Sequence, residues 1–447
     1  MRRTTFLTVP AILALGAIVA CEPTPPTGAT PDSVTAPPSA QGSTQPSAST
    51  QPASPDIVPV SPIAVAGPAE TAVKASNGFG LALYQELKGN SGNLVFSPAS
   101  ISVALAMTYA GAKGTTAKEM ETTLQSGPDA KALHAAWATQ LSAWQGHKDA
   151  EIAVANRLFG DKKYSFEAPY LSLTKAHYGA PLQPVDFAGA PEKQRVMING
   201  WVAEQTRDRI QDLIPPPGVT NDTRMALVNA IYFKAKWNEP FPASRTKDDS
   251  FTTADGTKVT TPMMSHTTYA QYGEVDGVQL MELGYKGGRF ATLFVLPPAT
   301  QKLAAVESKL DRALLDKWTG ALKGERTWIR LPKVKIEPGA AVELKKSLQA
   351  MGMKQAFVSG AADFTGITNP TNPEDRLFIE EVYHKAFVAM DEAGTEAAAA
   401  TAVMMGRAGG VAAEPKKFHA ERPFLFFIRD TTTHLVMFAG RIVDPTR

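Results

Sequence analysis

Apolar positions recur with a helical period in the first half of the chain and with a strand-like pattern in the second half. Phe79, Leu83 and Leu87, with Tyr84, recur at helical spacing and predict a first amphipathic helix. Further helices are expected at Ser97-Pro98, at the capping-box pattern Thr116 to Glu119, and over 197–213. Buried strands are expected over 225–233, 378–390, 424–428 and 434–442. Helices that dominate early and strands that dominate late predict an α+β fold.

The N-terminus has the pattern of an export signal. Arg2 and Arg3 precede an uncharged, mostly apolar run over 6–20, which is too short for an ordinary membrane span of ~20 residues. The run ends in Ile-Val-Ala-Cys21, which resembles a bacterial lipobox, where cleavage precedes the cysteine and the cysteine is lipidated. We therefore expect a lipoprotein signal peptide over 1–20 and a membrane anchor on Cys21, the only cysteine. A plain signal peptide that is cut nearby is the alternative.

Composition divides the rest of the chain into a tether and one domain. Between Glu22 and Pro68 lie 12 of the 34 prolines, with no lysine, arginine or aromatic residue, so this stretch lacks the apolar surface that folding requires. Residues 21–68 are therefore expected to form the lipidated cysteine and a disordered tether. The globular composition of 69–447 shows no second linker, which predicts a single domain. The net charge of +2 argues against a nucleic-acid partner.

No recognised catalytic motif supports an enzyme. The chain lacks a Gly-x-Ser-x-Gly elbow, a His-Glu-x-x-His pattern and paired cysteines, so we expect no metal and no cofactor. His384 lies in a strand-like segment, where a lone histidine is more often a hydrogen-bonded core residue than a catalyst.

The segment between Asp391 and Glu414 does not have the composition of an ordinary loop. It contains no proline and is nearly all alanine in the middle, so from composition alone an exposed helix fits as well as a strand. If the segment is a strand, alternate residues share one face. The side chains on this face are small at its start and larger and more apolar at its end: Thr395, Ala397, Ala399, Thr401, Val403 and Met405. That face suits a strand that slips between two existing strands, and proline would remove a ladder hydrogen bond.

Several separated motifs resemble the serpin family. Residues 391–403 (DEAGTEAAAATAV) resemble the hinge of an inhibitory serpin almost position for position. Residues 93–101 are similar to the family's shutter region, and 227–237 are similar to the third strand of its main sheet with the breach tryptophan. Residues 418–424 and 440–445 are similar to its C-terminal signature. The resemblance covers about 69–447.

The resemblance implies a fold and a set of functional positions. The fold would have three β-sheets with a main five-stranded sheet, eight or nine helices and an exposed reactive loop. The hinge would comprise Glu392, Gly394, Thr395, Glu396, Ala397, Ala398, Ala399, Ala400 and Thr401. The shutter and breach, where the sheet opens, would include Ser97, Ser100, Asn229, Trp237 and His384.

The resemblance also implies a function, that of a serine protease inhibitor that acts as a suicide substrate. The protease forms an acyl-enzyme at the loop, and insertion of the cleaved loop into the main sheet traps it. Counting from Glu392 places the reactive bond at Ala408-Gly409, which suits an elastase-like or subtilisin-like enzyme; the alternative, Arg407-Ala408, suits a trypsin-like enzyme. We expect a monomer, anchored by lipid outside the cytoplasm at the bacterial cell envelope. The rival hypotheses are a non-inhibitory serpin-fold binding lipoprotein and a cross-class inhibitor of cysteine proteases.

Overall fold

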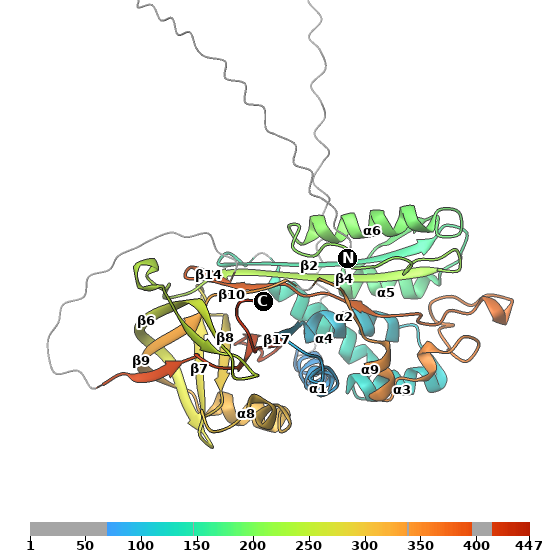
Figure 1. Cartoon of the computed structure of the whole chain (residues 1–447). Helices are drawn as coiled ribbons and strands as arrows, with labels where there is room; N and C mark the ends of the chain where they lie inside the picture. Colours follow the sequence, from blue (N-terminus) through green and yellow to red (C-terminus); the bar gives the residue numbers. More distant parts are fainter. Residues whose placement is uncertain (1–68, 146, 338, 396–413) are drawn as a thin grey trace, which may run out of the picture. The chain divides into compact units, whose positions relative to one another are not determined.

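The computed structural model of the chain describes residues 69–145, 147–337, 339–395 and 414–447 (Figure 1). These residues form nine α-helices within the described ranges, with three short 3-10 helices. The α-helices are α1 (Glu70–Leu87), α2 (Pro98–Tyr109), α3 (Gly114–Leu124), α4 (Ala130–Trp144), α5 (Ala168–Tyr178), α6 (Pro191–Gln205), α7 (Leu303–Glu307), α8 (Arg312–Gly320) and α9 (Lys345–Ala350). The 3-10 helices are η1 (Ala243–Arg245), η2 (Gln355–Phe357) and η3 (Pro373–Asp375). None of the described helices has the length and apolarity that a membrane span requires.

The main sheet has six strands in the described residues, one of them only two residues long. Its order is β10 (Val334–Ile336), β13 (Val388–Met390), β14 (Gly394–Thr395), β4 (Met225–Lys236), β2 (Ala150–Asp161) and β3 (Leu182–Val185). β2 and β4 pair antiparallel over eleven residues, from Ala150↔Ala235 to Gly160↔Met225. The short β14 lies between β13 and β4, so the chain that precedes residue 396 already enters the sheet there.

A second sheet has nine strands among the described residues, and a third has two. The second runs in the order β1 (Leu94–Phe96), β17 (Val436–Ile442), β16 (Phe424–Asp430), β8 (Phe290–Leu296), β7 (Val278–Gly284), β6 (Lys258–Val275), β9 (Lys323–Pro332) and β15 (Lys416–His419), with β5 (Lys247–Thr252) also paired to β6. The third pairs β11 (Val342–Glu343) with β12 (Tyr383–His384).

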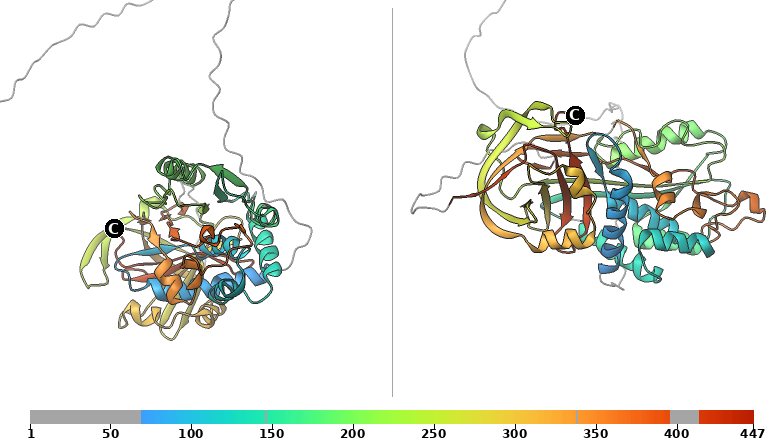
Figure 2. Two further views of the ribbon diagram at one scale, coloured as in Figure 1. Left: turned by 90° about the vertical axis from the view of Figure 1, so that its right-hand side faces the viewer. Right: turned by 60° about the horizontal axis from the view of Figure 1, so that its bottom comes forward.

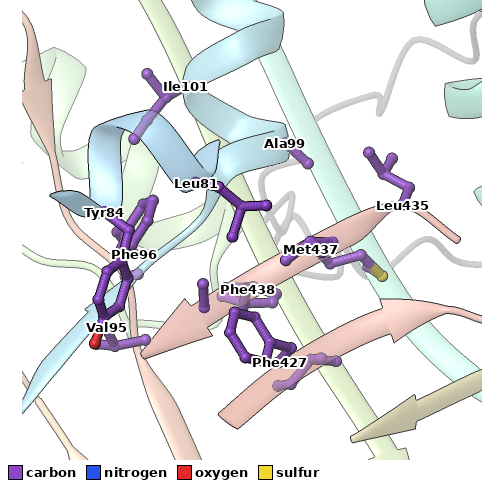
Figure 3. Packing of buried hydrophobic residues seen from close by; sticks show 14 of the residues in the cluster. Leu81, Tyr84, Val95, Phe96, Ala99, Ile101, Phe427, Leu435, Met437 and Phe438 are labelled. Carbon is purple, nitrogen blue, oxygen red and sulfur yellow. The ribbon is translucent and has the colours of Figure 1, made fainter. Parts of the chain in front are cut away.

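Two apolar cores cover the two faces of the main sheet. The larger core joins the face of β4 that carries Phe233 to α1, α2 and the strands β16 and β17. Figure 3 shows part of this core, where the Tyr84 ring of α1 lies beside Phe96 of β1, with centroids 6.2 Å apart. The smaller core lies between α6 and the opposite face of β2 and β4. The views of Figures 1 and 2 agree that α6 lies on one face of this sheet.

The first turn of α2 follows directly from its sequence. Ser97 is extended and its hydroxyl accepts a hydrogen bond from the Ser100 amide, which makes it the N-cap. Pro98 occupies the first helical position, where no amide hydrogen is needed. Nearly every side of the helix is buried, which fits its continuous apolar sequence.

Three local predictions need correction. α3 begins at Gly114, so Thr116 and Glu119 form no capping box; Thr116 accepts a hydrogen bond from the Asp363 amide, and Glu119 accepts from residues 354 and 355. α6 covers 191–205 rather than 197–213, because residues 207 and 208 have positive φ and end the helical path. Of the strand expected over 378–390, only 383–384 and 388–390 form strands; residues 378–382, which include Glu380 and Glu381, form none, since a strand needs a ladder partner and none lies beside them.

Candidate functional site

The point where β14 enters the main sheet is defined by very close backbone contacts. Gly394 pairs with Lys236, and Thr395 pairs with Ala235 on one side and with Met390 on the other. A Cβ atom on Gly394 would lie 2.1 Å from the Ala235 carbonyl oxygen, so only glycine fits without moving the backbone. Asp391 Oδ1 accepts hydrogen bonds from the amides of residues 393 and 394 and closes the turn that leads into β14.

Two stacked aromatic rings hold Thr395 in place. Thr395 is buried, and its hydroxyl hydrogen-bonds to the Tyr285 hydroxyl at 2.5 Å, which also bonds Thr292 at 2.6 Å. The Tyr285 ring stacks on Trp237 with centroids 4.5 Å apart and planes at 9°. Trp237 in turn donates its indole N–H to the Asp391 carbonyl at 2.9 Å. This stack, with Lys333 and Glu392, is called the upper junction below.

Glu392 ties the hinge to two neighbouring elements of the upper junction. Its carboxylate pairs with Lys333 Nζ at 2.9 Å and accepts a hydrogen bond from the Thr246 hydroxyl at 2.8 Å. Its carbonyl accepts from the Phe241 amide at 2.8 Å. Burial opposes ionisation, but the hydrogen bonds from Lys333, its own backbone and Thr246 together keep the pKa of Glu392 below its ordinary value. The residue is therefore a charged anchor at neutral pH.

Four of the residues expected at the shutter lie together beneath the middle of the main sheet. The Ser97 amide donates to His384 Nε2 at 3.0 Å, and the Ser97 hydroxyl donates to the Met437 carbonyl at 2.6 Å. The Ser100 hydroxyl donates to Asn229 Oδ1 on β4. Ser97, Ser100, Asn229 and His384 form what is called the polar cluster below. It joins α2 to both sides of the place where the sheet would part.

His384 is held neutral within this cluster. Complete burial lowers its pKa to about 4, because the charged imidazolium loses its hydration there. The hydrogen bond from the Ser97 amide also requires an unprotonated Nε2. The geometry supports a structural histidine, as the sequence pattern favoured, rather than a catalyst.

A cavity lies beside the N-terminal half of β4. It has a volume of 510 Å³ and lies between residues 225–229 of β4 and residues 376–384. Ile101 and Leu105 of α2 also line it, and His384 and Asn229 stand at its border. Among the described residues, β4 has no strand partner on this side except Gly394 and Thr395. This sheet cavity therefore continues the line on which β14 begins.

The comparisons with known proteins agree with this geometry. A family model described as Serpin (serine protease inhibitor) matches residues 74–445. The chain belongs to the serpin family. An uncharacterised serpin-like protein of Thermococcus kodakarensis is 39% identical over 382 residues, which cover 85% of this chain and 87% of the relative. The leukocyte elastase inhibitor of Xenopus laevis is 37% identical over 374 residues, 81% of this chain and 96% of the relative.

Solved serpin structures share the fold. The crystal structure of Serpin48 of the insect Tenebrio molitor matches with a TM-score of 0.73 and 31% identity, over 83% of this chain and 97% of that one. The predicted α+β serpin fold is confirmed, with nine α-helices and three sheets in the described residues. The main sheet has the five expected strands, and β14 is a sixth. Serpins are in general protease inhibitors rather than enzymes.

Some predicted positions of this serpin lie outside the described residues. They are Cys21, the hinge positions Glu396, Ala397, Ala398, Ala399, Ala400 and Thr401, and the reactive-bond candidates Arg407, Ala408 and Gly409. The described part of the hinge ends at Thr395. Within the described residues, no group of three or more histidine, cysteine or acidic side chains is arranged to hold a metal ion.

Sequence reasoning missed three contributors to the serpin's site. Tyr285 and Lys333 complete the upper junction, and Asn156 on β2 pairs with Asn229 across the β2–β4 ladder. No local motif marks the first two, because each lies in a separate strand region and reaches the hinge only through the topology. Asn156 had a detectable signal, since it follows the apolar run 152–155 in the middle of a strand.

The stability of the serpin fold is expected to fall as the pH decreases from about 6.5 to 4. His384 has a folded pKa of about 4 and an ordinary value of 6.5, so the unfolded chain binds the proton first and is favoured on acidification. The loss reaches about 3 kcal/mol at most, since each pKa unit corresponds to about 1.4 kcal/mol. His384→Gln should flatten this part of the pH dependence in urea unfolding followed at several pH values.

His134 in α4 provides the matched control. Burial, with repulsion from His177, lowers its pKa to about 4 as well, so His134→Gln should remove a separate share of the same pH dependence. If His384→Gln and the unmodified protein lose stability equally between pH 6.5 and 4, His384 is not buried as a neutral group.

Proposed function

We propose that this serpin is an inhibitory member of its family, a suicide substrate that traps a serine protease as an acyl-enzyme. The single observation that carries the proposal is β14, because two residues of the hinge already occupy the position of a strand between β13 and β4. Cleavage of the loop would free the segment that follows, and this segment would continue down the same line into the sheet cavity.

The register of β14 determines which positions would meet in the cleaved form. Because Gly394 pairs with Lys236 and Thr395 with Ala235, one-for-one continuation brings Thr401 opposite Asn229 and Met405 opposite Met225, the first residue of β4. The inserted strand would thus match β4 along its whole length. The eleven residues from Thr395 to Met405 would span about 36 Å, at ~3.3 Å per residue.

The two faces of the inserted strand would meet different surroundings. Thr395 lies on the side of the larger core, so Val403 and Met405 would face that side too and bury apolar surface near the sheet cavity. The alternate positions would lie on the side of the smaller core, where Val228 and Ala230 of β4 are covered by α6. Alanine at 398, 400 and 402 suits the middle of this side, which α6 covers, while Glu396 and Met404 would lie at its two ends, opposite Lys234 and Ala226.

The energetics place the driving force in apolar burial. A backbone hydrogen bond stabilises by about 0.5–1.5 kcal/mol net, while ordering a residue costs about 1–2 kcal/mol. These terms nearly cancel along the strand. The surplus must come from apolar side chains that fill the 510 Å³ cavity and from relief of the incomplete sheet. Insertion would then carry the protease along the sheet and distort its active site, so that hydrolysis of the acyl bond stalls.

Thr395→Arg should change the protein from an inhibitor into a substrate. Thr395 is only 2% exposed and bonded to Tyr285, so an arginine would bury an unpaired charge at a cost of several kcal/mol. Insertion would slow, and the protease would be released before it is trapped. The measurement is a denaturing gel of covalent complexes, with the stoichiometry of inhibition, against a panel of elastase-like, subtilisin-like and trypsin-like enzymes.

Thr395→Ser is the matched control, because it keeps the hydroxyl and should form complexes at the wild-type ratio. A Thr395→Arg variant that forms denaturant-stable complexes as efficiently as the wild type would contradict trapping by insertion. Papain in the same panel tests the cysteine-protease alternative. If no enzyme in the panel forms a covalent complex with the wild type, the result supports the non-inhibitory alternative.

The reactive bond is proposed at Ala408-Gly409, with Arg407-Ala408 as the alternative. The first implies a shallow specificity pocket, as in elastase or subtilisin, and the second an acidic pocket, as in trypsin. We expect the C-terminal fragment released from the complex to begin at Gly409 when it is sequenced. A fragment that begins at Ala408 would select the trypsin-like class, and one that begins outside 405–411 would show that the loop is misaligned.

We propose in addition that the protein is exported and anchored by lipid on Cys21, with 22–68 as the tether and 69–447 as the serpin domain. Cys21→Ser should abolish metabolic labelling with a radioactive fatty acid and move the protein from the membrane fraction to the soluble fraction. Thr27→Ser in the same tether is the control and should leave both unchanged. Retention of the Cys21→Ser variant in the membrane would disprove the anchor.

A further inference from the structure

Two histidine rings lie side by side between α4 and α5. His134 is on α4 and His177 is in the last turn of α5, and their ring centroids are 6.2 Å apart with planes at 52°. His134 is buried, whereas His177 is partly exposed, so one side of the pair reaches solvent. The two residues are called the histidine pair below. Neither belongs to the polar cluster or to the upper junction.

One ring nitrogen of His134 is held by a neighbouring side chain. Nδ1 hydrogen-bonds to the Tyr178 hydroxyl at 2.6 Å, and the edge of one ring faces the other. Burial raises the pKa of Tyr178 well above its ordinary value, so the phenol is neutral. When Nδ1 carries the proton and donates it to the hydroxyl oxygen, Nε2 keeps its lone pair. Metal-binding histidines are oriented in the same way, by a hydrogen bond from the other ring nitrogen.

His177 also has a ring nitrogen without a partner. Its Nδ1 is buried and has no hydrogen-bond partner. Buried polar atoms are nearly always paired in native proteins, so this nitrogen indicates a missing ligand. Burial lowers the pKa of His177, and burial with repulsion from His177 lowers that of His134 to about 4. Both imidazoles are therefore neutral at pH 7.5, which is the form that binds metal ions.

The spacing of the two rings suits one shared ion. Zinc bonds to histidine nitrogen at about 2.0–2.1 Å, so two such bonds hold the ring centres about 5–6.5 Å apart, depending on the angle at the ion. The observed separation of 6.2 Å falls in this range. The two helices thus already stand at the distance that a bridging ion requires.

The surroundings of the histidine pair select the kind of ion. Imidazole nitrogen suits zinc, copper and nickel, whereas Mg²⁺ and Ca²⁺ take oxygen ligands. The aromatic neighbours are Tyr109 of α2 and Tyr178, and burial raises the pKa of both, so they stay neutral. Among the described residues, the charged neighbour that shifts the pKa of His134 is His177 itself. The pair therefore offers nitrogen to a ligand.

We propose that the histidine pair is a binding site for one Zn²⁺ ion. The ion would bond to Nε2 of His134 and Nδ1 of His177, and water would take the remaining positions of a tetrahedral shell. With two protein ligands in place of four, the affinity would be lower than that of a structural zinc site. The site does not depend on the proposed inhibitory function, because neither histidine lies on the line of insertion.

A bound ion would join α4 to α5 beside the main sheet. The Tyr178 carbonyl accepts a hydrogen bond from Asn156 Nδ2 at 2.8 Å, and Asn156 is bonded to Asn229 across the β2–β4 ladder. The end of α5 is therefore one residue away from the polar cluster. Because the two rings are brought together only by the fold, the ion should bind and stabilise the folded state.

The test measures thermal unfolding and titration calorimetry of the full chain, purified without a polyhistidine tag. The Cys21→Ser background removes the one thiol, which could also bind zinc. At pH 7.5 we expect the melting temperature to rise with ZnCl₂ up to about 1 mM and to return when EDTA is added. MgCl₂ at the same concentration should have no effect, because its ion prefers oxygen ligands.

Variants of the pair should lose this response. His177→Gln removes a ligand and should weaken Zn²⁺ binding by at least about 10-fold, with loss of the rise in melting temperature. Tyr178→Phe keeps both ligands and should weaken binding by about 10-fold, since loss of such a supporting bond costs about 10–100-fold in metal affinity. His147→Gln is the matched control. His147 also has a buried Nδ1 without a partner, but its ring packs on Phe290, away from another histidine.

The outcomes decide whether the histidine pair is the site. If Zn²⁺ stabilises His177→Gln as much as the parent protein, the ion binds elsewhere and the proposal is refuted. The absence of saturable Zn²⁺ binding to the parent protein would refute it as well. Loss of binding in His147→Gln alone would assign the ion to that residue. Because His177 is partly exposed, its variant tests the site even if His134→Gln fails to fold.

Discussion

The open side of β4 is the constraint on which the rest of this structure depends. On one side β4 is paired with β2 along eleven residues, but on the other side its only strand partners among the described residues are Gly394 and Thr395. Buried backbone groups are nearly always paired in native proteins, so a strand with one incomplete ladder is held away from its best arrangement. The 510 Å³ cavity occupies the same place. Missing hydrogen bonds and missing apolar contacts thus reside at one site, which a single inserted strand could fill.

Two sets of contacts keep this site as it is. At the top, the Trp237–Tyr285 stack and the Lys333–Glu392 pair fix the hinge after two residues of insertion. In the middle, the bond from the Ser97 amide to His384 joins α2 to the segment that faces β4 across the cavity. Each of these contacts contributes only about 1–2 kcal/mol, so they can be broken and replaced one after another. A continuous apolar contact in the same place would resist opening far more strongly, because its side chains could not exchange their contacts for new partners one at a time.

The sequence predicted the fold and most of the site through patterns that are local. The helix start at Ser97 and the buried strand expected over 225–233 follow from residue type and periodicity. The hinge positions follow from the resemblance to the serpin family, because a run of small residues without proline fits a helix as well as a strand. Tyr285 could not be predicted, because a buried tyrosine in a strand is ordinary until the topology brings it to Thr395. The strand expected over 378–390 was only partly right for a related reason, because only 383–384 and 388–390 form strands. Phe378, Ile379 and Val382 are typical of a strand, but strand formation requires a partner, and residues 378–382 line the cavity instead.

Under the proposed mechanism, the order of residue sizes along the hinge would separate the rate of insertion from the stability of the inserted state. The first residues to enter would have to pass the upper junction. The space there is so narrow that a Cβ atom added to Gly394 would lie 2.1 Å from the Ala235 carbonyl oxygen. Small side chains there lower the barrier but bury little surface, so they contribute little to the final state. Val403 and Met405 would arrive last and opposite Leu227 and Met225, at the border of the cavity, where they bury the most apolar area. An inhibitor of the proposed kind, which would have to insert its loop before deacylation and then hold the inserted state, has reason to place these two requirements at opposite ends of one strand.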